Sequence, residues 1–85
     1  MDAQRLYDRY HGLIVTMAEQ ASPQHATKDL LQGLLARFDR EAASLPGDSL
    51  RWLKNEFAEQ LEQRLLRTTS VQAREVFALA SKHFE

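Results

Sequence analysis

Apolar residues recur at intervals of three and four along most of this chain, the spacing that brings side chains to one face of an α-helix. The first stripe consists of Leu6, Tyr10, Leu13, Ile14, Met17 and Ala21. Asp2 precedes it and belongs to the residue types favoured at a helix N-cap. Pro23 follows it, and the residue before a proline is pushed away from helical backbone angles. The pattern therefore predicts a first helix that ends near Ala21 and Ser22.

The second stripe is broader than the first. It consists of Leu30, Leu31, Leu34, Leu35, Phe38, Ala42 and Leu45. A face of this width can contact two neighbouring helices at once, which predicts that this helix is the central one. Thr27 is the expected N-cap, with Ser22 beginning a preliminary turn. The alternative is a helix that begins at Pro23 with Ser22 as its cap.

The segment Leu45-Pro46-Gly47-Asp48 predicts a turn, because proline and glycine interrupt helices and favour turn geometry. Gly47 is able to supply a positive φ in such a turn. Asp48 or Ser49 would then cap a third helix that runs from about Ser49 to Arg67. The stripe of this helix is narrow enough to be buried by one neighbour. It consists of Leu50, Leu53, Phe57, Leu61 and Leu65.

The last apolar stripe is out of phase with the third. It consists of Ala73, Val76, Phe77, Ala80 and Phe84. On one straight helix it would be rotated by roughly 120° from the preceding stripe, so the two sets cannot face the same core. Residues 68–70 are poor helix formers, and Thr69 with Gln72 has the spacing of a capping box. The pattern predicts a break between two helices at residues 68–70.

Together the stripes predict an all-α fold, a compact bundle of about four short amphipathic helices in a single domain of residues 1–85. The alternative keeps the third and fourth helices continuous and uses the second apolar face to pair with another copy. That arrangement is a dimer of helical hairpins with a long C-terminal helix.

Composition narrows the compartment and the class of protein. Hydrophobic residues make up 44% and charged residues 27% of the 85, as in ordinary globular domains. Without cysteine there is neither a disulfide framework nor a thiolate metal site, and the N-terminus lacks the basic and apolar regions of a signal peptide. No apolar run approaches the roughly 20 residues that span a bilayer. We expect a cytoplasmic protein without a membrane segment, and the excess of arginine over lysine suggests a bacterial source.

No group of residues has the spacing of a catalytic or metal site. None of the three histidines has a second His or Cys three or four residues away, and the three glycines are isolated. Asp8 and His11 are one helical turn apart, and we interpret His11 as an exposed histidine. The glutamates that recur on the third helix are interpreted as a solvated face; they are Glu56, Glu59 and Glu62. The sequence therefore predicts no enzymatic activity, no metal, no cofactor and no small-molecule substrate.

Trp52 is the residue that points to a partner. It lies roughly 200° round the third helix from Leu50, on the side opposite the apolar stripe, with Leu66 as its nearest apolar companion. In one interpretation a neighbouring helix covers Trp52, and its indole N–H finds a hydrogen-bond acceptor. In the other, Trp52 and Leu66 form a surface anchor that Phe77 or Phe84 would extend. The sequence does not decide between them.

The first functional hypothesis is a small cytoplasmic protein-interaction module, acting as a regulator, adaptor, inhibitor or chaperone. It would dock a partner protein through an apolar helical surface and also form a homodimer. The predicted partner-binding residues are Trp52 and Leu66 at the centre with Arg51, Glu59 and Arg67 at the rim.

The alternative hypothesis is a dimeric nucleic-acid-binding regulator. Dimerisation would gather Arg51, Lys54, Arg64 and Arg67 into one basic surface. The net charge of -1, with acidic and basic residues interleaved, makes nucleic acid the less expected partner.

Overall fold

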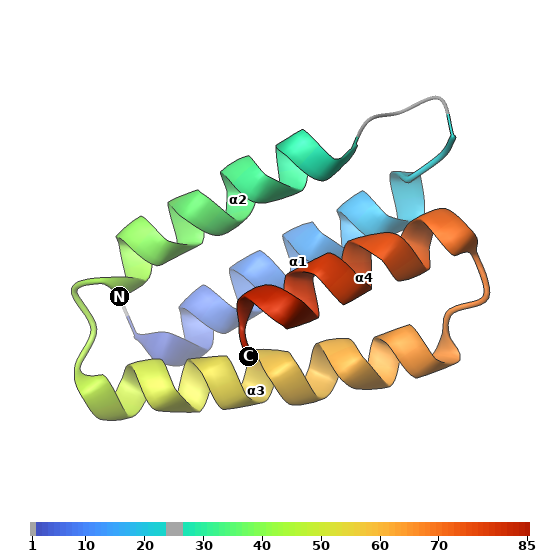
Figure 1. The fold of residues 1–85 in the computed structure, drawn as a ribbon. Helices are drawn as coiled ribbons and strands as arrows, with labels where there is room; N and C mark the ends of the chain where they lie inside the picture. The colour runs from blue at the N-terminus through green and yellow to red at the C-terminus, as the bar shows by residue number, and fades with distance from the viewer. Residues whose placement is uncertain (1, 24–26) are drawn as a thin grey trace.

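The computed structural model describes residues 2–23 and 27–85, and this part of the chain contains four α-helices and no strand. The helices are α1 (Ala3–Gln20), α2 (Thr27–Ala42), α3 (Gly47–Arg67) and α4 (Val71–His83). Consecutive helices run in opposite directions (Figure 1). The predicted all-α bundle of four short helices is confirmed.

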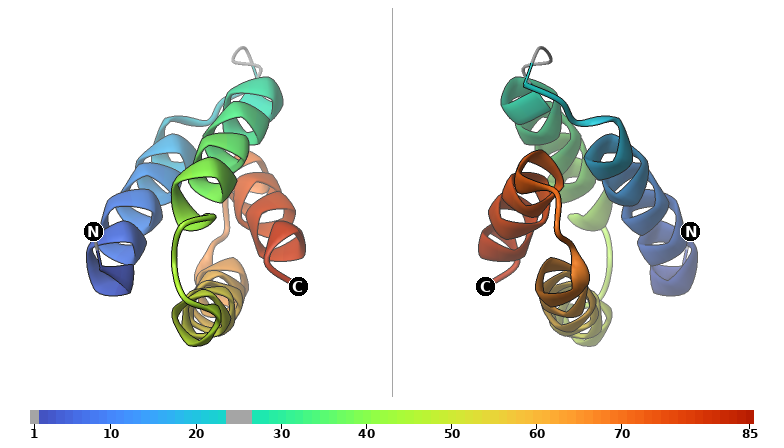
Figure 2. Two further views of the ribbon diagram at one scale, coloured as in Figure 1. Left: turned by 90° about the vertical axis from the view of Figure 1, so that its left-hand side faces the viewer. Right: turned by 90° about the vertical axis from the view of Figure 1, so that its right-hand side faces the viewer.

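The order of the helices around the bundle differs from their order in the chain. Seen end-on, α2 and α3 occupy opposite corners, with α1 and α4 at the other two (Figure 2). The segment between α2 and α3 therefore crosses one end of the bundle, and α1 lies beside α3, which runs in the same direction. This parallel pair of neighbours forms the surface described below.

The prediction that the second helix is central is wrong. Both α1 and α4 pack against all three other helices, α4 most extensively, whereas α2 packs mainly against α1 and α4. Two alanines of the α4 stripe, Ala73 and Ala80, are buried, and small side chains at a helix contact let neighbouring helices approach closely. The broad stripe of α2 is only partly covered, since Leu30 stays exposed while Leu31 and Leu35 are buried.

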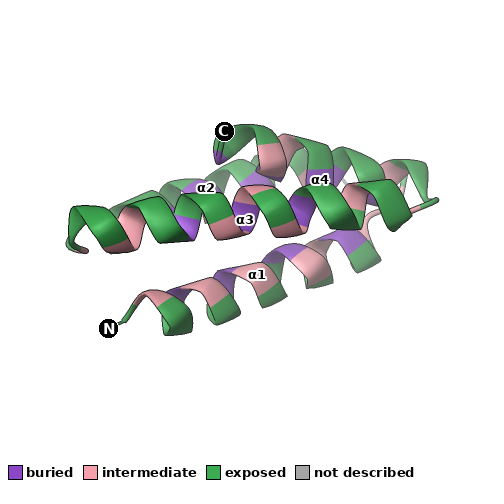
Figure 3. Cartoon of the chain, turned by 90° about the horizontal axis from the view of Figure 1, so that it is seen from below, coloured by how far each residue is buried: buried purple, intermediate pink, exposed green. Residues whose placement is uncertain are grey.

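The core is apolar throughout the described part of the chain, where no polar or charged residue is buried. Buried positions follow the inner faces of the helices (Figure 3). At the centre the Phe57 ring stacks on Phe84, with ring centroids 4.4 Å apart, and meets Phe38 at 5.3 Å. A fourth ring, Tyr7 from α1, lies 4.8 Å from Phe57. The apolar stripe of α3 is thus buried by several segments rather than by the single neighbour predicted.

The first two helices begin close to their predicted positions. The Asp2 carboxylate accepts a hydrogen bond from the backbone N–H of Arg5 at 2.8 Å, which confirms Asp2 as the N-cap of α1. Thr27 is the first residue of α2 rather than its cap. Pro23 lies in a turn and not in a helix. The remainder of the predicted preliminary turn, residues 24–26, lies outside the described residues.

The start of α3 corrects the predicted turn. The helix begins at Gly47, two residues earlier than expected, and Gly47 has no positive φ. Pro46 takes the N-cap position with φ -59°, and its carbonyl accepts the Leu50 N–H at 3.0 Å. Proline's fixed φ supplies this entry geometry, so Asp48 and Ser49 fall inside the first turn instead of capping it. There the Asp48 carboxylate complements the positive end of the helix dipole.

The break between α3 and α4 is confirmed, with α3 ending at Arg67 as predicted. This break excludes a continuous C-terminal helix. The N-cap of α4 is Ser70, whose Oγ accepts the Ala73 N–H at 3.4 Å, and not Thr69. Thr68 closes the end of α3 by donating its hydroxyl to the Arg64 carbonyl at 2.7 Å. None of the helices in the described part of the chain combines the length and the apolar character that crossing a bilayer requires.

Candidate functional site

Trp52 lies at the surface of the bundle, with 39% of the residue exposed. Its ring meets Tyr7 of α1 edge-on, with centroids 6.0 Å apart and planes inclined by 63°. Tyr7 in turn packs on the core through Phe57. Trp52 is therefore supported on one side by the α1–α3 contact, while much of the indole stays accessible.

An open hollow of about 380 Å³ adjoins Trp52. Its lining consists of Ala3, Gln4, Asp48, Ser49 and Trp52. These residues come from the first turn of α1 and from the beginning of α3, which lie side by side because the two helices are parallel neighbours. The short side chains of Ala3 and Ser49 leave room beside the indole that a side chain of another molecule can enter.

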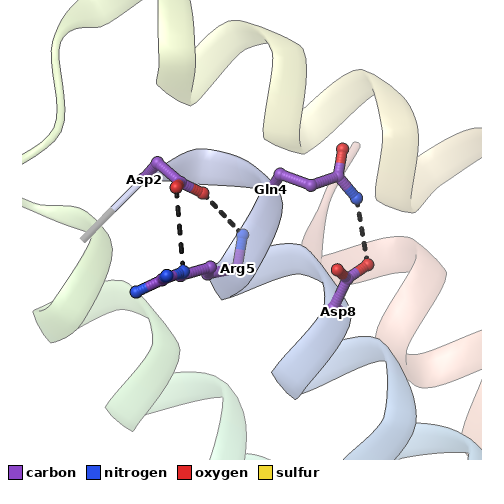
Figure 4. Close-up of polar contacts among 4 residues, drawn as sticks. All are labelled: Asp2, Gln4, Arg5 and Asp8. Carbon is purple, nitrogen blue, oxygen red and sulfur yellow. Dashed lines mark hydrogen bonds and ion pairs between the residues drawn. The ribbon is translucent and has the colours of Figure 1, made fainter.

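Three carboxylates at this end of the α1–α3 contact each have a polar partner: Asp8 pairs with Gln4, Asp2 with Arg5 and Asp48 with Arg51. Gln4 and Asp8 project from one side of α1, where the Gln4 amide donates to the Asp8 carboxylate at 2.9 Å, while Asp2 and Arg5 lie on another side (Figure 4). Asp48 forms a 3.5 Å ion pair with Arg51 in which both side chains are largely exposed. Exposed pairs of this kind contribute little to stability because water and salt screen them.

Burial and nearby charges both act on the Tyr7 hydroxyl. Burial raises the pKa of Tyr7 above its ordinary value of 10.0, and the nearby Glu56 and Asp8 carboxylates raise it further. Arg64 acts in the opposite direction with the smallest effect. The neutral phenol is therefore the favoured form of Tyr7.

His11 is partly buried, contrary to the expectation of an exposed histidine. Its ring stacks on Tyr7, with centroids 5.1 Å apart and planes inclined by 22°. The Nε2 atom is buried and has no hydrogen-bond partner among the described residues. Burial lowers the pKa of His11 below 6.5, and Arg64 lowers it further against the opposing effect of Asp8 and Glu56. Three rings thus form a row along the α1–α3 contact, in the order His11, Tyr7, Trp52.

The remaining predicted site residues do not gather around Trp52. Leu66 is 75% exposed, but it lies 14 residues further along α3, a distance of about 21 Å on a helix. Arg51 is adjacent to Trp52 in the chain, Glu59 is exposed midway along α3, and Arg67 ends the helix. Phe77 and Phe84, which were to extend the anchor, are buried in the core. Of the predicted set, only Arg51 stays close to Trp52.

The four cations of the nucleic-acid hypothesis are spread along α3. Arg51 and Lys54 lie near its beginning and Arg64 and Arg67 in its last turn. The exposed acidic residues Glu59 and Glu62 lie between the two pairs. On one chain these cations do not form a continuous basic surface.

A second apolar surface lies between α1 and α2, at the opposite end of the bundle from Trp52. This groove of about 250 Å³ is lined by Leu13, Thr16, Met17, Gln20, Thr27 and Leu30. Leu13 is 40% and Leu30 65% exposed, although the helical pattern predicts both as core residues. The breadth of the α2 stripe is the signal that could have revealed this surface, since a single face wider than its neighbours leaves apolar residues uncovered.

Within residues 2–23 and 27–85, no three side chains of His, Cys, Asp or Glu are grouped closely enough to hold a metal ion. His25 lies outside these residues.

Comparison of the chain with protein-family models, with curated protein sequences and with solved structures gives no significant match. Its function is therefore inferred from the geometry of its own residues.

Proposed function

We propose that the chain is a protein-interaction module that docks a partner protein through the Trp52 surface, defined as Trp52, Tyr7 and the adjoining hollow. The observation that carries the proposal is a large, accessible indole at the edge of a hollow. Tryptophan is enriched among the residues that dominate binding energy at protein interfaces, where it fills or borders pockets. Docking would remove the exposed part of the indole from water and fill the hollow.

The supports of Trp52 favour binding without rearrangement. Tyr7 contacts the indole from α1 and also contacts Phe57 in the core, so the ring rests on two packed helices. A side chain held in place before binding loses less conformational entropy when a partner docks. This arrangement suits a regulator, adaptor, inhibitor or chaperone, and the lack of cysteine fits a reducing cytoplasm.

Self-association is the second part of the proposal, and charge assigns it to the α1–α2 groove. The described residues that line this groove are all uncharged, in a chain where 23 of 85 residues carry charge. An uncharged apolar face can pair with the same face of a second copy without repulsion, as a twofold dimer requires. The hollow of the Trp52 surface is lined by the Asp48 carboxylate, which would lie opposite its own copy in a twofold pairing through that surface.

The test compares Trp52→Ala with Leu66→Ala as a matched control. Leu66 is a large exposed apolar residue on the same helix, about 21 Å away along its axis. We expect a stoichiometric protein from the native lysate to bind wild type and Leu66→Ala but not Trp52→Ala. With the purified protein, binding to Trp52→Ala should be weaker by about tenfold or more.

Stability is measured on the same variants. Loss of the Tyr7–Trp52 ring contact should lower the free energy of unfolding by about 1 kcal/mol, which leaves the bundle folded. A partner that binds Trp52→Ala as well as wild type would contradict the proposal. Recovery that disappears on nuclease treatment would support the nucleic-acid alternative instead. Unfolding of Trp52→Ala would assign the residue a structural role.

A further inference from the structure

We infer that the partner segment docked at the Trp52 surface presents an arginine or lysine side chain, whose charged end lies against the indole and the Asp48 carboxylate. The inference rests on the proposed function, because it specifies the chemistry of the partner at that surface.

The lining of the hollow is complementary to a cation. Asp48 is the charged residue among the described residues that line it, and Gln4 and Ser49 add polar groups without positive charge. The Asp48 carboxylate is occupied only by the exposed 3.5 Å contact with Arg51. Because that pair is solvated, a cation from a partner can replace Arg51 at little energetic cost.

The helix termini at this surface do not cancel the negative charge. The N-terminal ends of α1 and α3 each carry roughly half a positive charge. Asp2 caps the first and Asp48 lies in the first turn of the second, so each helix end has its own carboxylate. Asp8 and Glu56 lie further along the contact and are additional, and both act on Tyr7 as negative charges. Arg5 pairs with Asp2 and Arg51 pairs with Asp48, so the carboxylate that a docked cation would use is that of Asp48, in place of Arg51.

The position of Asp48 gives the docked side chain a direction. The Asp48 carboxylate lines the hollow together with Trp52, at the end of the ring row away from His11. The cation is expected at this end.

Arginine and lysine also fit the shape and chemistry of the hollow. Their aliphatic stems can lie along apolar surface such as Ala3 while the charged group stays near water. Tryptophan is the aromatic side chain that attracts cations most strongly over its ring face. A guanidinium can in addition bind a carboxylate through two parallel hydrogen bonds. One basic side chain therefore uses both the indole and Asp48.

The test uses the purified full chain and two peptide probes that differ at one position, acetyl-Ala-Leu-Arg-Leu-Ala-amide and its Glu counterpart. NMR titration should show the arginine peptide shifting the Trp52 indole N–H and the backbone amides of Gln4 and Ser49. Its affinity should exceed that of the glutamate peptide by about tenfold and should fall with added salt.

Asp48→Asn and Asp29→Asn are the matched variants. Both remove one exposed carboxylate from the first turn of a helix, but only Asp48 lines the hollow. We expect Asp48→Asn to weaken binding of the arginine peptide several-fold and Asp29→Asn to leave it unchanged.

Several results would overturn the inference. They are equal binding of both peptides, no shift with the arginine peptide at its highest soluble concentration, shifts centred on His11, and equal effects of the two variants. Binding of the native partner distinguishes failure of this inference from failure of the proposed function. A partner that requires Trp52 but ignores both Asp48→Asn and salt would leave the proposed function standing and remove the basic side chain.

Discussion

At the scale of single residues, the row of His11, Tyr7 and Trp52 joins a titratable ring to the accessible indole. The imidazole stacks on Tyr7 with its Nε2 atom buried, and Tyr7 contacts Trp52 from its other side. Protonation of His11 would place a positive charge beside Arg64, with Asp8 and Glu56 as the compensating carboxylates. The stability of the α1–α3 contact is consequently linked to pH.

The sign of this linkage follows from the lowered pKa of His11 in the folded chain. The unfolded chain takes up the proton first, so the free energy of unfolding should fall as pH drops through about 6.5 and level off below the folded-state pKa. His11→Phe retains an aromatic ring at this position and cannot be protonated. We expect the stability difference between wild type and His11→Phe to shift in favour of the variant on going from pH 8 to pH 5.

Urea denaturation of both proteins measures this difference, and emission from the single tryptophan follows the same titration at the Trp52 surface. A stability difference that is constant with pH would show that the folded chain does not disfavour the His11 imidazolium. A change of opposite sign would show that Asp8 and Glu56 outweigh burial and Arg64.

At the scale of the elements, the N-cap of α4 gives two adjacent residues, Thr69 and Ser70, different contributions to stability. Ser70 accepts the Ala73 N–H, whereas Thr69 is exposed in the connection. Ser70→Ala should lower the free energy of unfolding by about 1 kcal/mol, and Thr69→Ala should change it by a few tenths at most. Denaturant midpoints of the two variants check this. A greater loss for Thr69→Ala would restore the capping box that the sequence predicts.

Helical periodicity predicts the elements well because it depends on residues within one helix. It yields the all-α class, the break at residues 68–70 and the α4 stripe, whose members are all buried. The starts of α2, α3 and α4 are displaced by one or two residues, since a cap requires a particular backbone geometry that several neighbouring residues can supply. Pro46 takes this position before α3, and Ser70 takes it before α4.

The apolar periodicity of a helix does not predict which other helices pack against it. Periodicity places Trp52 opposite the α3 stripe, but only the position of α1 beside α3 brings Tyr7 against it. For the same reason periodicity predicts neither the partial burial of His11 nor the exposure of Leu30, because both depend on which helix lies alongside. A stripe identifies the side of a helix that is apolar and not how much of it a partner helix covers.

At the scale of the whole molecule, the two candidate surfaces lie at opposite ends of the bundle and differ in charge. The α1–α2 groove is uncharged among its described lining residues, whereas the hollow of the Trp52 surface is lined by the Asp48 carboxylate. Pairing of two copies through the groove would leave both Trp52 surfaces accessible. A dimer built in this way could bind two segments of one partner, which raises the overall affinity without any new contact.

Sedimentation of Leu30→Gln beside Trp52→Ala tests whether self-association uses the groove and partner binding uses the Trp52 surface. Leu30 is 65% exposed, so its replacement should leave the fold intact while removing the largest uncovered apolar group of the groove. We expect wild type and Trp52→Ala to sediment as dimers. The dimer dissociation constant of Leu30→Gln should be about tenfold higher than that of wild type. Leu30→Gln should still bind a Trp52-dependent partner, though less tightly if that partner engages both copies.

A wild type that stays monomeric at every concentration would refute self-association. A dimer that Trp52→Ala dissociates would place the second copy on the Trp52 surface, against the charge argument for the groove.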